Sequence, residues 1–450
     1  MTQKTLIKNA RMVNEDIVRK GDLLIRNGRI EKIDSSIEAT GTEQVYDARG
    51  GWLLPGMIDD QVHFREPGLT YKAGIWSESR AAAAGGITSF MEMPNTKPAT
   101  VTLQALEDKY AIGADKSLVN YSFYLGATND NLDVIRSLQP GSAAGIKIFM
   151  GASTGNMLVD NEETLAGIFR DAPALIATHC ESSPMIQENL DAALERYGNE
   201  IPVTEHPNIR SAEACYQSTL LAQSLAREYN APLHVLHLST AREMELFEPG
   251  PMKGKLITGE ICVHFLHFSA DDYPRLGNLI KCNPAIKTAA DKEALIKALQ
   301  DGRLDIIATD HAPHTSEEKA SSDYLVAPSG LPLVQDALLC VLELYHDGVI
   351  RMEDIVRRTA HNVADRFAVL ERGYLREGYW ADLVLVDTRQ PTEATRERVL
   401  SKCGWSPFEG ETFRSSIVST FVNGQPVWHN GQLVESQSAA RLQFGKQREL

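Results

Sequence analysis

Eight short apolar runs alternate with longer amphipathic stretches through the middle of the chain. The runs are 56–62, 87–93, 121–125, 144–150, 174–178, 232–238, 255–263 and 304–309. Helical periodicity lies between most of them, for example over 184–196, 211–228 and 292–299. Eight strand–helix units in about 300 residues are typical of a (β/α)8 barrel. The sequence therefore predicts an α/β protein in which residues 55–375 form a TIM-like barrel.

The two ends of the chain have a different texture. Near the start, apolar and polar residues alternate in TLIKNARMV, DLLIRNGRIEKID and QVYDARGGWLLP, between Asn-Gly and Gly-Gly turns. Near the end, residues 382–387 form an apolar run, and 417–424 with 425–428 predict a hairpin that closes at Asn423-Gly424. We expect residues 1–54 and 376–450 to pair into one small β-sandwich domain.

Composition narrows the possible classes of function. The formal net charge is −15 and no run of Lys or Arg occurs, which argues against nucleic acid or an anionic membrane as a partner. The six cysteines form no CxxC pair, and neither an 18-residue apolar run nor a signal-peptide pattern is present. These features predict a cytoplasmic protein that acts on a small molecule.

Residue types that bind metal ions follow several of the predicted strands. Chemistry in a (β/α)8 barrel takes place at the carboxyl ends of the strands, so side chains there converge on one mouth. The first, fifth, sixth and eighth runs end at His63, His179, His237 and Asp310. Because side chains alternate along a strand, Gln61, His63 and Arg65 share one face. Together these residues predict a metal site with nitrogen and oxygen ligands.

A lysine interrupts the fourth apolar run. Lys147 lies in GIKIF, and burying an ammonium costs free energy unless the group is paired or chemically altered. One alternative is an ion pair with a carboxylate such as Asp310. The other is capture of CO₂, which turns the amine into a carbamate whose oxygens can bridge two divalent metal ions. The sequence of the run leaves both open.

Several motifs together carry a resemblance to a known family. They are PGMIDDQVHFREPGLTYK (55–72), AAAAGGITSFMEMPNTKP (81–98), GIKIFMG (145–151), THCE (178–181), HVLHLST (234–240), KCNPAIK (281–287), DIIATDHAPHTSEEK (305–319) and GWSPFEG (404–410). On these stretches the chain resembles the metal-dependent amidohydrolase superfamily and, within it, the dihydroorotases of pyrimidine biosynthesis. HFREPG, MPNT and ATDHAPHT are together highly specific.

The resemblance implies a role for each matching residue. The implied ligands of one or two Zn²⁺ ions per subunit are His63, a carboxylated Lys147, His179, His237 and Asp310. Asp310 is also implied to move the proton. The implied substrate-binding residues are Arg65, Asn95 and His314 for the carboxylate and Asn283 for the ring. The resemblance further implies a homodimer.

The implied reaction interconverts L-dihydroorotate and water with N-carbamoyl-L-aspartate, the third step of de novo pyrimidine (UMP) synthesis. A divalent metal lowers the pKa of bound water and polarises the amide carbonyl, so a metal-activated hydroxide can attack the ring. Asp310 can take the proton and hand it to the leaving nitrogen. A planar guanidinium matches a carboxylate with two hydrogen bonds, which makes Arg65 the natural clamp.

The chain departs from the family pattern at the first strand, which usually reads His-x-His. Here Gln61 replaces one imidazole with an amide, a weaker ligand for zinc. The first metal site therefore binds weakly, uses Asp60 or water, or is empty. Since the remaining ligands and the carboxylate-binding residues are present, we expect activity to be retained. His234 lies outside the implied ligand set and is predicted to be a packed or supporting histidine.

Other functions stay open at this stage. An allantoinase or a dihydropyrimidinase shares the metal residues and differs in the residues that bind the carboxylate. A catalytically impaired relative that serves as a scaffold for aspartate transcarbamoylase is supported by Gln61 alone. Loops 151–156 and 315–330 follow the strands of Lys147 and Asp310. They either close over the substrate or are simple connections.

Overall fold

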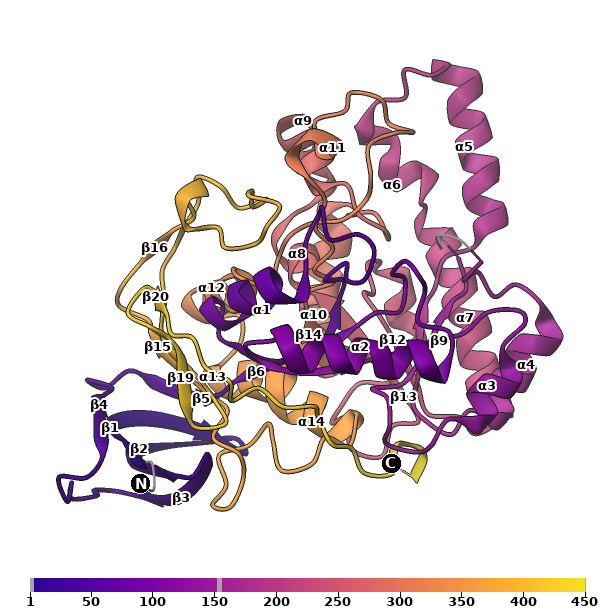
Figure 1. Cartoon of the computed structure of the whole chain (residues 1–450). Coiled ribbons are helices and arrows are strands. Elements are labelled where there is room, and N and C mark those ends of the chain that lie inside the picture. Colours follow the sequence, from indigo (N-terminus) through magenta and orange to yellow (C-terminus); the bar gives the residue numbers. More distant parts are fainter. Residues whose placement is uncertain (1–3, 152–155, 450) are drawn as a thin grey trace.

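The computed structural model describes residues 4–151 and 156–449, and a parallel barrel lies at its centre (Figure 1). The barrel strands are β6 (Met57–Val62), β7 (Ile87–Glu92), β8 (Asn120–Phe123) continued by β9 (Leu125–Gly126), β10 (Ile146–Phe149), β11 (Ile176–His179), β12 (Leu233–Val235), β13 (Ile257–Cys262) and β14 (Ile306–Ala308). Neighbours pair in parallel from β6 to β8 and from β9 to β14. The predicted barrel is therefore confirmed.

The barrel closes between its first and last strands. Val62 and His311 form a parallel bridge, and the His63 amide donates a 2.7 Å hydrogen bond to the His311 carbonyl. This closure brings the residues after β6 beside those after β14. It places His63 and Asp310, which are 247 positions apart in the sequence, at the same mouth.

Helices connect the barrel strands and cover their outer faces. The longer ones are α1 (Ile75–Ala84), α2 (Leu103–Lys116), α3 (Leu132–Ser137), α4 (Glu162–Asp171), α5 (Ser183–Tyr197), α7 (Ala212–Glu228), α10 (Ala289–Asp301) and α12 (Ala337–His346). Side-chain caps fix the starts of four of them; for example, Ser211 accepts from the Ala214 amide and Thr288 from the Asp291 amide. Helices expected over 184–196, 211–228 and 292–299 correspond to α5, α7 and α10.

Shorter helices lie in the connections. They are α6 (His206–Ile209), α8 (Val263–His267), α9 (Tyr273–Leu276), α11 (Ser316–Lys319), α13 (Met352–Val356) and α14 (Asn362–Arg366), with a π-helical turn at Arg357–His361 between the last two. Single 3₁₀ turns occupy Val203–Glu205, Arg242–Leu246, Ala270–Asp272, Gly277–Ile280, Arg396–Arg398 and Gln447–Glu449. Of the two connections that were candidates for a lid, 315–330 contains α11, whereas 152–155 lie outside the described residues.

The two chain ends form one nine-stranded sheet beside the barrel, where indigo and yellow strands meet in Figure 1. Its members are β1 (Lys4–Asn14), β2 (Ile17–Arg26), β3 (Arg29–Asp34), β4 (Gln44–Asp47), β5 (Trp52–Pro55), β15 (Leu383–Asp387), β18 (Ser416–Val422), β19 (Gln425–His429) and β20 (Gln432–Leu433). Antiparallel pairing of β5 with β15 joins the ends. The β domain and its hairpin at Asn423-Gly424 are confirmed; the exact limits predicted for the segments stay a prediction.

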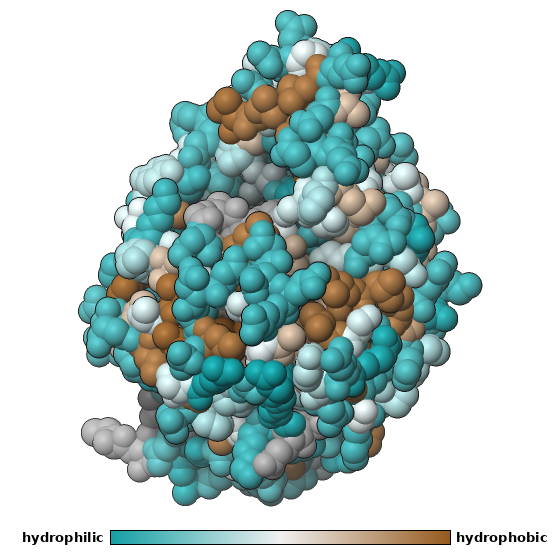
Figure 2. Space-filling model, turned by 90° about the vertical axis from the view of Figure 1, so that its right-hand side faces the viewer, coloured by the Kyte–Doolittle hydropathy of each residue, from teal (hydrophilic) through white to brown (hydrophobic). Residues whose placement is uncertain are grey.

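Two short strands and the C-terminal segment complete the fold. Strands β16 (Thr392–Glu393) and β17 (Thr412–Phe413) form a separate pair. Leu442 and Phe444 pack with Tyr124 and Phe367 in a buried cluster. Figure 2 shows the face that carries α5 and α7, where hydrophobic groups gather in separate patches on a largely hydrophilic surface. No helix of the described residues is long and apolar enough to cross a membrane.

Candidate active site

Gln61 lies near the end of β6 and His63 directly follows that strand. Both side chains contact Asp310, which follows β14. His63 Nε2 and Gln61 Nε2 each lie 3.1 Å from the same oxygen, Oδ1 of Asp310. Gln61 thus faces the carboxylate with its N–H group, while its Oε1 lies 3.8 Å from the Cys262 thiol. In this orientation Gln61 is a hydrogen-bond donor to Asp310 rather than a metal ligand. Its role as a weak or absent ligand stays a prediction.

Asn95, which follows β7, fixes the ring of His63. The Asn95 Oδ1 atom lies 2.7 Å from His63 Nδ1. Burial lowers the pKa of His63 despite the opposing Asp310 carboxylate, so the ring carries a single proton. With that proton on Nδ1 and donated to Asn95, Nε2 has a free lone pair directed towards Asp310, as a metal ligand requires. The Nδ2 hydrogens of Asn95 are left for another acceptor.

A second pair of imidazoles converges from β11 and the end of β12. His179 Nδ1 lies 2.9 Å from His237 Nε2, and the Glu181 carboxylate accepts a 2.8 Å hydrogen bond from His179 Nε2. That bond holds the proton of His179 on Nε2 and leaves the Nδ1 lone pair facing His237. Arg210 in turn lies 3.4 Å from Glu181. Glu181 therefore acts as a positioning residue for His179.

Lys147 on β10 is buried between these groups. Its side chain is 1% exposed, and its Nζ lies 4.6 Å from the centre of the Phe149 ring. Within the described residues the Nζ makes no salt bridge, so the alternative of a direct ion pair with Asp310 is not observed. Burial lowers the pKa of Lys147 to about 8, although Asp310 and Glu260 oppose this shift. A neutral fraction of the amine, the form that can capture CO₂, is therefore present near neutral pH.

The donor set fits a divalent metal ion of the zinc type. Zinc bonds of about 2.0–2.1 Å place neighbouring donors of a tetrahedron roughly 3.3 Å apart. The His179–His237 and His63–Asp310 donor pairs, at 2.9 and 3.1 Å, are within a few tenths of an ångström of that spacing. The charge of Lys147 contributes to the pKa of each of these four residues, and we propose that the two pairs form one site. The individual ligand roles stay predictions.

Three of the predicted site residues have backbone angles that are unusual for a side chain with a Cβ atom. The φ angles are 68° at Arg65, 40° at His237 and 51° at Asp310. This left-handed region costs free energy for residues other than glycine and is retained where the surroundings impose it, often at active sites. The turns aim these side chains into the barrel mouth directly after their strands end.

A cationic group lies on one side of the mouth. Arg65 donates a 3.0 Å hydrogen bond to the Pro313 carbonyl, and its Nη2 atom lies 3.1 Å from His314 Nε2. The Lys72 ammonium donates to His314 Nδ1 at 2.8 Å and pairs with Glu318. Burial and the charges of Arg65 and Lys72 hold the pKa of His314 far below its ordinary value, so the ring is neutral.

Arg65 is a buried cation without an acidic partner. The side chain is 8% exposed and makes no salt bridge to a carboxylate within the described residues. Its sequence neighbour Glu66 pairs with Lys116. Burial lowers the pKa of Arg65 to about 10, so it remains a cation at neutral pH. A buried guanidinium of this kind is stabilised by an anionic ligand.

The side chain of Asn283 is oriented by Arg210. Arg210 Nε donates a 2.6 Å hydrogen bond to Asn283 Oδ1. The Nδ2 group of Asn283 is thereby left as a donor. The predicted carboxylate binders and the predicted ring binder thus lie in separate groups, with Arg65 beside His314 and Asn283 beside Arg210.

Sequence reasoning did not assign roles to several residues around the site. These are Lys72, Glu181, Arg210 and Glu260. Glu181 carried a readable signal, because it stands two residues after His179 in THCE and so shares its face. Glu260 accepts a 2.9 Å hydrogen bond from the His237 amide, which no local pattern indicates. His234 is fully buried beside Asp60 and Glu260, as expected for a supporting histidine.

The chain matches a family of hydrolases. The model described as "Amidohydrolase family" matches residues 52–427. An allantoinase from Deinococcus radiodurans is 32% identical over 440 residues, covering 96% of this chain and 97% of that protein. A dihydroorotase from Methanosarcina acetivorans is 34% identical over 417 residues, covering 90% and 88%.

A solved structure gives the same result. The L-hydantoinase (dihydropyrimidinase) from Arthrobacter aurescens matches with a TM-score of 0.92 and 27% identity, covering 98% of this chain and 100% of that one. The chain belongs to the amidohydrolase family. Its relatives carry the names of different ring-opening enzymes, so the choice of substrate depends on the contacts within the site.

Proposed function

We propose that the protein is a dihydroorotase, which interconverts L-dihydroorotate and water with N-carbamoyl-L-aspartate in pyrimidine biosynthesis. The observation that carries this proposal is the buried Arg65, which forms no salt bridge with a carboxylate in the part of the chain that the structure describes. Dihydroorotate brings a carboxylate, whereas allantoin, hydantoin and dihydrouracil are neutral rings. Dihydroorotases at 34% identity are among the relatives, but allantoinases at 32% are equally close, so the choice depends on Arg65.

Substrate recognition in this proposal uses groups that the structure leaves available. The Nη atoms of Arg65 bind the carboxylate, and Asn95 donates to it from Nδ2 because Oδ1 is engaged by His63. His314 lies beside Arg65, and because its Nδ1 faces Lys72 and its Nε2 faces the Ser329 carbonyl, it must exchange one of these partners to bind the carboxylate itself. Asn283, held through its Oδ1 by Arg210, donates from Nδ2 to a carbonyl of the ring.

The chemistry divides between a metal ion and the residues of the chain. His63, Lys147 as a carbamate, His179, His237 and Asp310 would hold one or two Zn²⁺ ions. When bound, such an ion lowers the pKa of water and polarises the amide carbonyl. Lys147 becomes a ligand when its neutral amine adds to CO₂ and loses a proton, which leaves an anionic carbamate.

Asp310 is the proton carrier in this proposal. Both Gln61 and His63 contact Oδ1, so Oδ2 is the oxygen that is left to take a proton and return it to the leaving nitrogen. Although burial opposes it, the positive charge of the unmodified Lys147 contributes to a pKa of Asp310 below its ordinary value. The carboxylate is therefore ionised and ready to act as the base. General acid–base help of this kind typically contributes about 10²–10⁴ in rate.

A substrate panel tests the proposal. The purified protein, supplied with zinc and bicarbonate, is assayed with L-dihydroorotate, allantoin, hydantoin and dihydrouracil. We expect kcat/KM to be highest for L-dihydroorotate, and Arg65→Met to remove that preference. Arg136→Met on the exposed face of α3 is the matched control and leaves it unchanged.

Other results of the substrate panel would favour a different function. A preference for allantoin would overturn the proposal in favour of an allantoinase, the name of one of the relatives. Absence of turnover on every ring, together with absence of bound metal, would favour a scaffold for a partner such as aspartate transcarbamoylase. A homodimer stays a prediction and is read from the same preparation by its mass in solution.

A further inference from the structure

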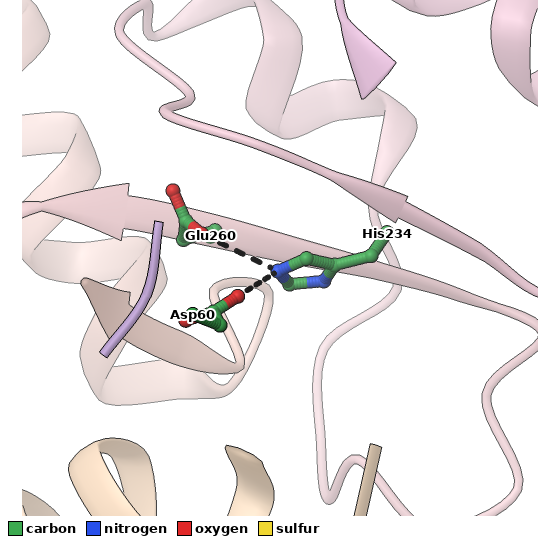
Figure 3. A group of neighbouring side chains, drawn as sticks. All are labelled: Asp60, His234 and Glu260. Atoms are coloured by element: carbon green, nitrogen blue, oxygen red, sulfur yellow. Dashed lines mark ion pairs between the residues drawn. The ribbon is translucent and has the colours of Figure 1, made fainter. Parts of the chain in front are cut away.

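Three buried side chains meet inside the barrel, below the mouth described above. Asp60 on β6, His234 on β12 and Glu260 on β13 point towards one another (Figure 3). His234 Nε2 lies 3.2 Å from Asp60 Oδ2 and 3.5 Å from Glu260 Oε2, and all three residues have no exposed surface. His234 precedes His237 by three positions along its strand, so this cluster is distinct from the site at the mouth.

Within the described residues, the contacts of the cluster are ion pairs rather than well-aligned hydrogen bonds, and four of its polar atoms have no hydrogen-bond partner. These atoms are Asp60 Oδ1 and Oδ2, His234 Nε2 and Glu260 Oε2. The other oxygen of Glu260, Oε1, accepts from the His237 amide at 2.9 Å. Buried polar atoms are nearly always satisfied, and two carboxylates that face each other without water repel. A positive charge at the centre of the cluster would therefore stabilise it.

One tautomer of His234 makes a nitrogen lone pair available to bind a metal ion at this position. His234 Nδ1 lies 2.8 Å from the Thr258 hydroxyl, and that hydroxyl has the Leu233 carbonyl within 3.5 Å as an acceptor. When Thr258 donates to Leu233, Nδ1–H of His234 donates to Thr258. The Nε2 lone pair is then directed at the two carboxylates, which is the arrangement of a histidine metal ligand with a supporting hydrogen bond.

We propose that Asp60, His234 and Glu260 bind a divalent metal ion of the zinc type inside the barrel, separate from the ions at the mouth. Donors around tetrahedral zinc lie roughly 3.3 Å apart, and the separations of 3.2 and 3.5 Å from His234 match that spacing. One imidazole and two carboxylates form a donor set that suits zinc, and the second oxygen of Asp60 is present for a further bond.

The ion would also support the mouth of the barrel. Glu260 binds the ion through Oε2 and the His237 amide through Oε1, so it links the cluster to His237. His237 has a φ angle of 40° and needs such support to keep its turn. The inference does not depend on which ring the enzyme opens, because it concerns metal content alone.

Metal analysis of a variant that lacks the metal site at the barrel mouth tests this proposal. The double variant Lys147→Met/His179→Asn removes ligands at the mouth and leaves the cluster intact. After loading with zinc and desalting, we expect this variant to retain one zinc per chain. Adding Asp60→Asn should remove that zinc. Glu243→Gln alters an equally buried carboxylate that bonds Thr219 and Thr240, and it should leave the zinc in place.

Crystallography of the wild-type protein gives an independent answer if a variant fails to fold. Anomalous scattering recorded at the zinc edge should show a peak between His234 Nε2, Asp60 and Glu260. A double variant that holds no zinc, or zinc content unchanged by Asp60→Asn, would overturn the proposal. An absent peak in zinc-loaded wild-type crystals would do the same and would assign the charge to a proton on His234. Turnover of dihydroorotate is not read in either experiment, so failure here is separable from failure of the proposed function.

Discussion

Nε2 of Gln61 donates a 3.1 Å hydrogen bond to Oδ1 of Asp310, the oxygen that also lies 3.1 Å from His63 Nε2. An amide N–H therefore stands where the resemblance implies an imidazole. It restrains the carboxylate and, in the proposed site, withholds one metal ligand. In our proposal the first metal position depends on His63, Asp310 and a carboxylated Lys147.

Gln61→His tests this relationship. The new imidazole can supply the missing ligand, so we expect zinc to bind at least about tenfold more tightly at the mouth, which corresponds to ~1.4 kcal/mol. Competition titration against a chelator measures the affinity. Gln61→Asn keeps an amide and should give no gain. Equal affinity in wild type and Gln61→His would show that position 61 does not limit metal binding.

Arg65→Met separates substrate binding from metal binding. Hydrogen bonds to charged groups contribute about 1.5–3 kcal/mol, so loss of the guanidinium should raise KM for dihydroorotate by roughly 10- to 100-fold. Zinc content should stay at the wild-type value, because Arg65 contacts Pro313 and His314 rather than the metal ligands. Steady-state kinetics combined with metal analysis measure both quantities. Unchanged KM would remove Arg65 from the substrate site.

Asp310→Asn should abolish proton transfer. The amide keeps the size of the side chain and loses its basicity, so we expect kcat to fall by about 10²–10⁴ even when zinc is supplied in excess. The amide also weakens one metal ligand, so kcat is compared at saturating zinc. A variant that turns over dihydroorotate at the wild-type rate would refute the role of Asp310.

Glu181→Gln should change stability and its dependence on pH. Although burial opposes ionisation, Arg210 and His179 lower the pKa of Glu181 to about 2, from 4.5. A lowered carboxylate pKa stabilises the folded state above pH 4.5, and this stabilisation is lost as the pH falls through 2. Breaking a buried pair typically costs about 3 kcal/mol, and we expect a loss of that size at pH 7.

Denaturant unfolding between pH 7 and pH 2 checks this expectation. Between pH 4.5 and 2 the free energy of unfolding should fall more steeply in the wild type than in Glu181→Gln. Glu188→Gln, on the exposed face of α5, is the control and should follow the wild type. Parallel curves for Glu181→Gln and the wild type would show that the contacts of Glu181 with Arg210 and His179 do not stabilise the folded state.

The fold could be predicted from the sequence because each strand and helix has a local pattern of apolar and polar residues. A barrel strand buried on both faces is a continuous apolar run, so β6 to β14 could be counted along the chain. The pairing of β5 with β15 was indicated by the matching texture of the two ends. Ligand types at strand ends were also visible, since the barrel brings all such ends to one mouth.

The contacts within the site were less predictable, because they depend on closure of the barrel and on local irregularities. Alternation along β6 places residues 61, 63 and 65 on one face, and Gln61 and His63 do share Asp310. The pairing of β6 with β7 is irregular between Asp59 and Val62, and Asp60 also reaches the interior and meets His234. Arg210 reaches Asn283 across 73 positions, which no periodicity indicates.

The central claim is that the barrel mouth holds zinc through His179, His237 and a carboxylated Lys147, with Arg65 as the anchor for the substrate carboxylate. The most direct measurement is a crystal structure of the protein supplied with zinc, bicarbonate and N-carbamoyl-L-aspartate. We predict continuous density for a carbamate on Lys147, a zinc ion at the two histidines and a ligand carboxylate on Arg65. An unmodified ammonium at Lys147, with no ion beside the histidines and no ligand at Arg65, would contradict it.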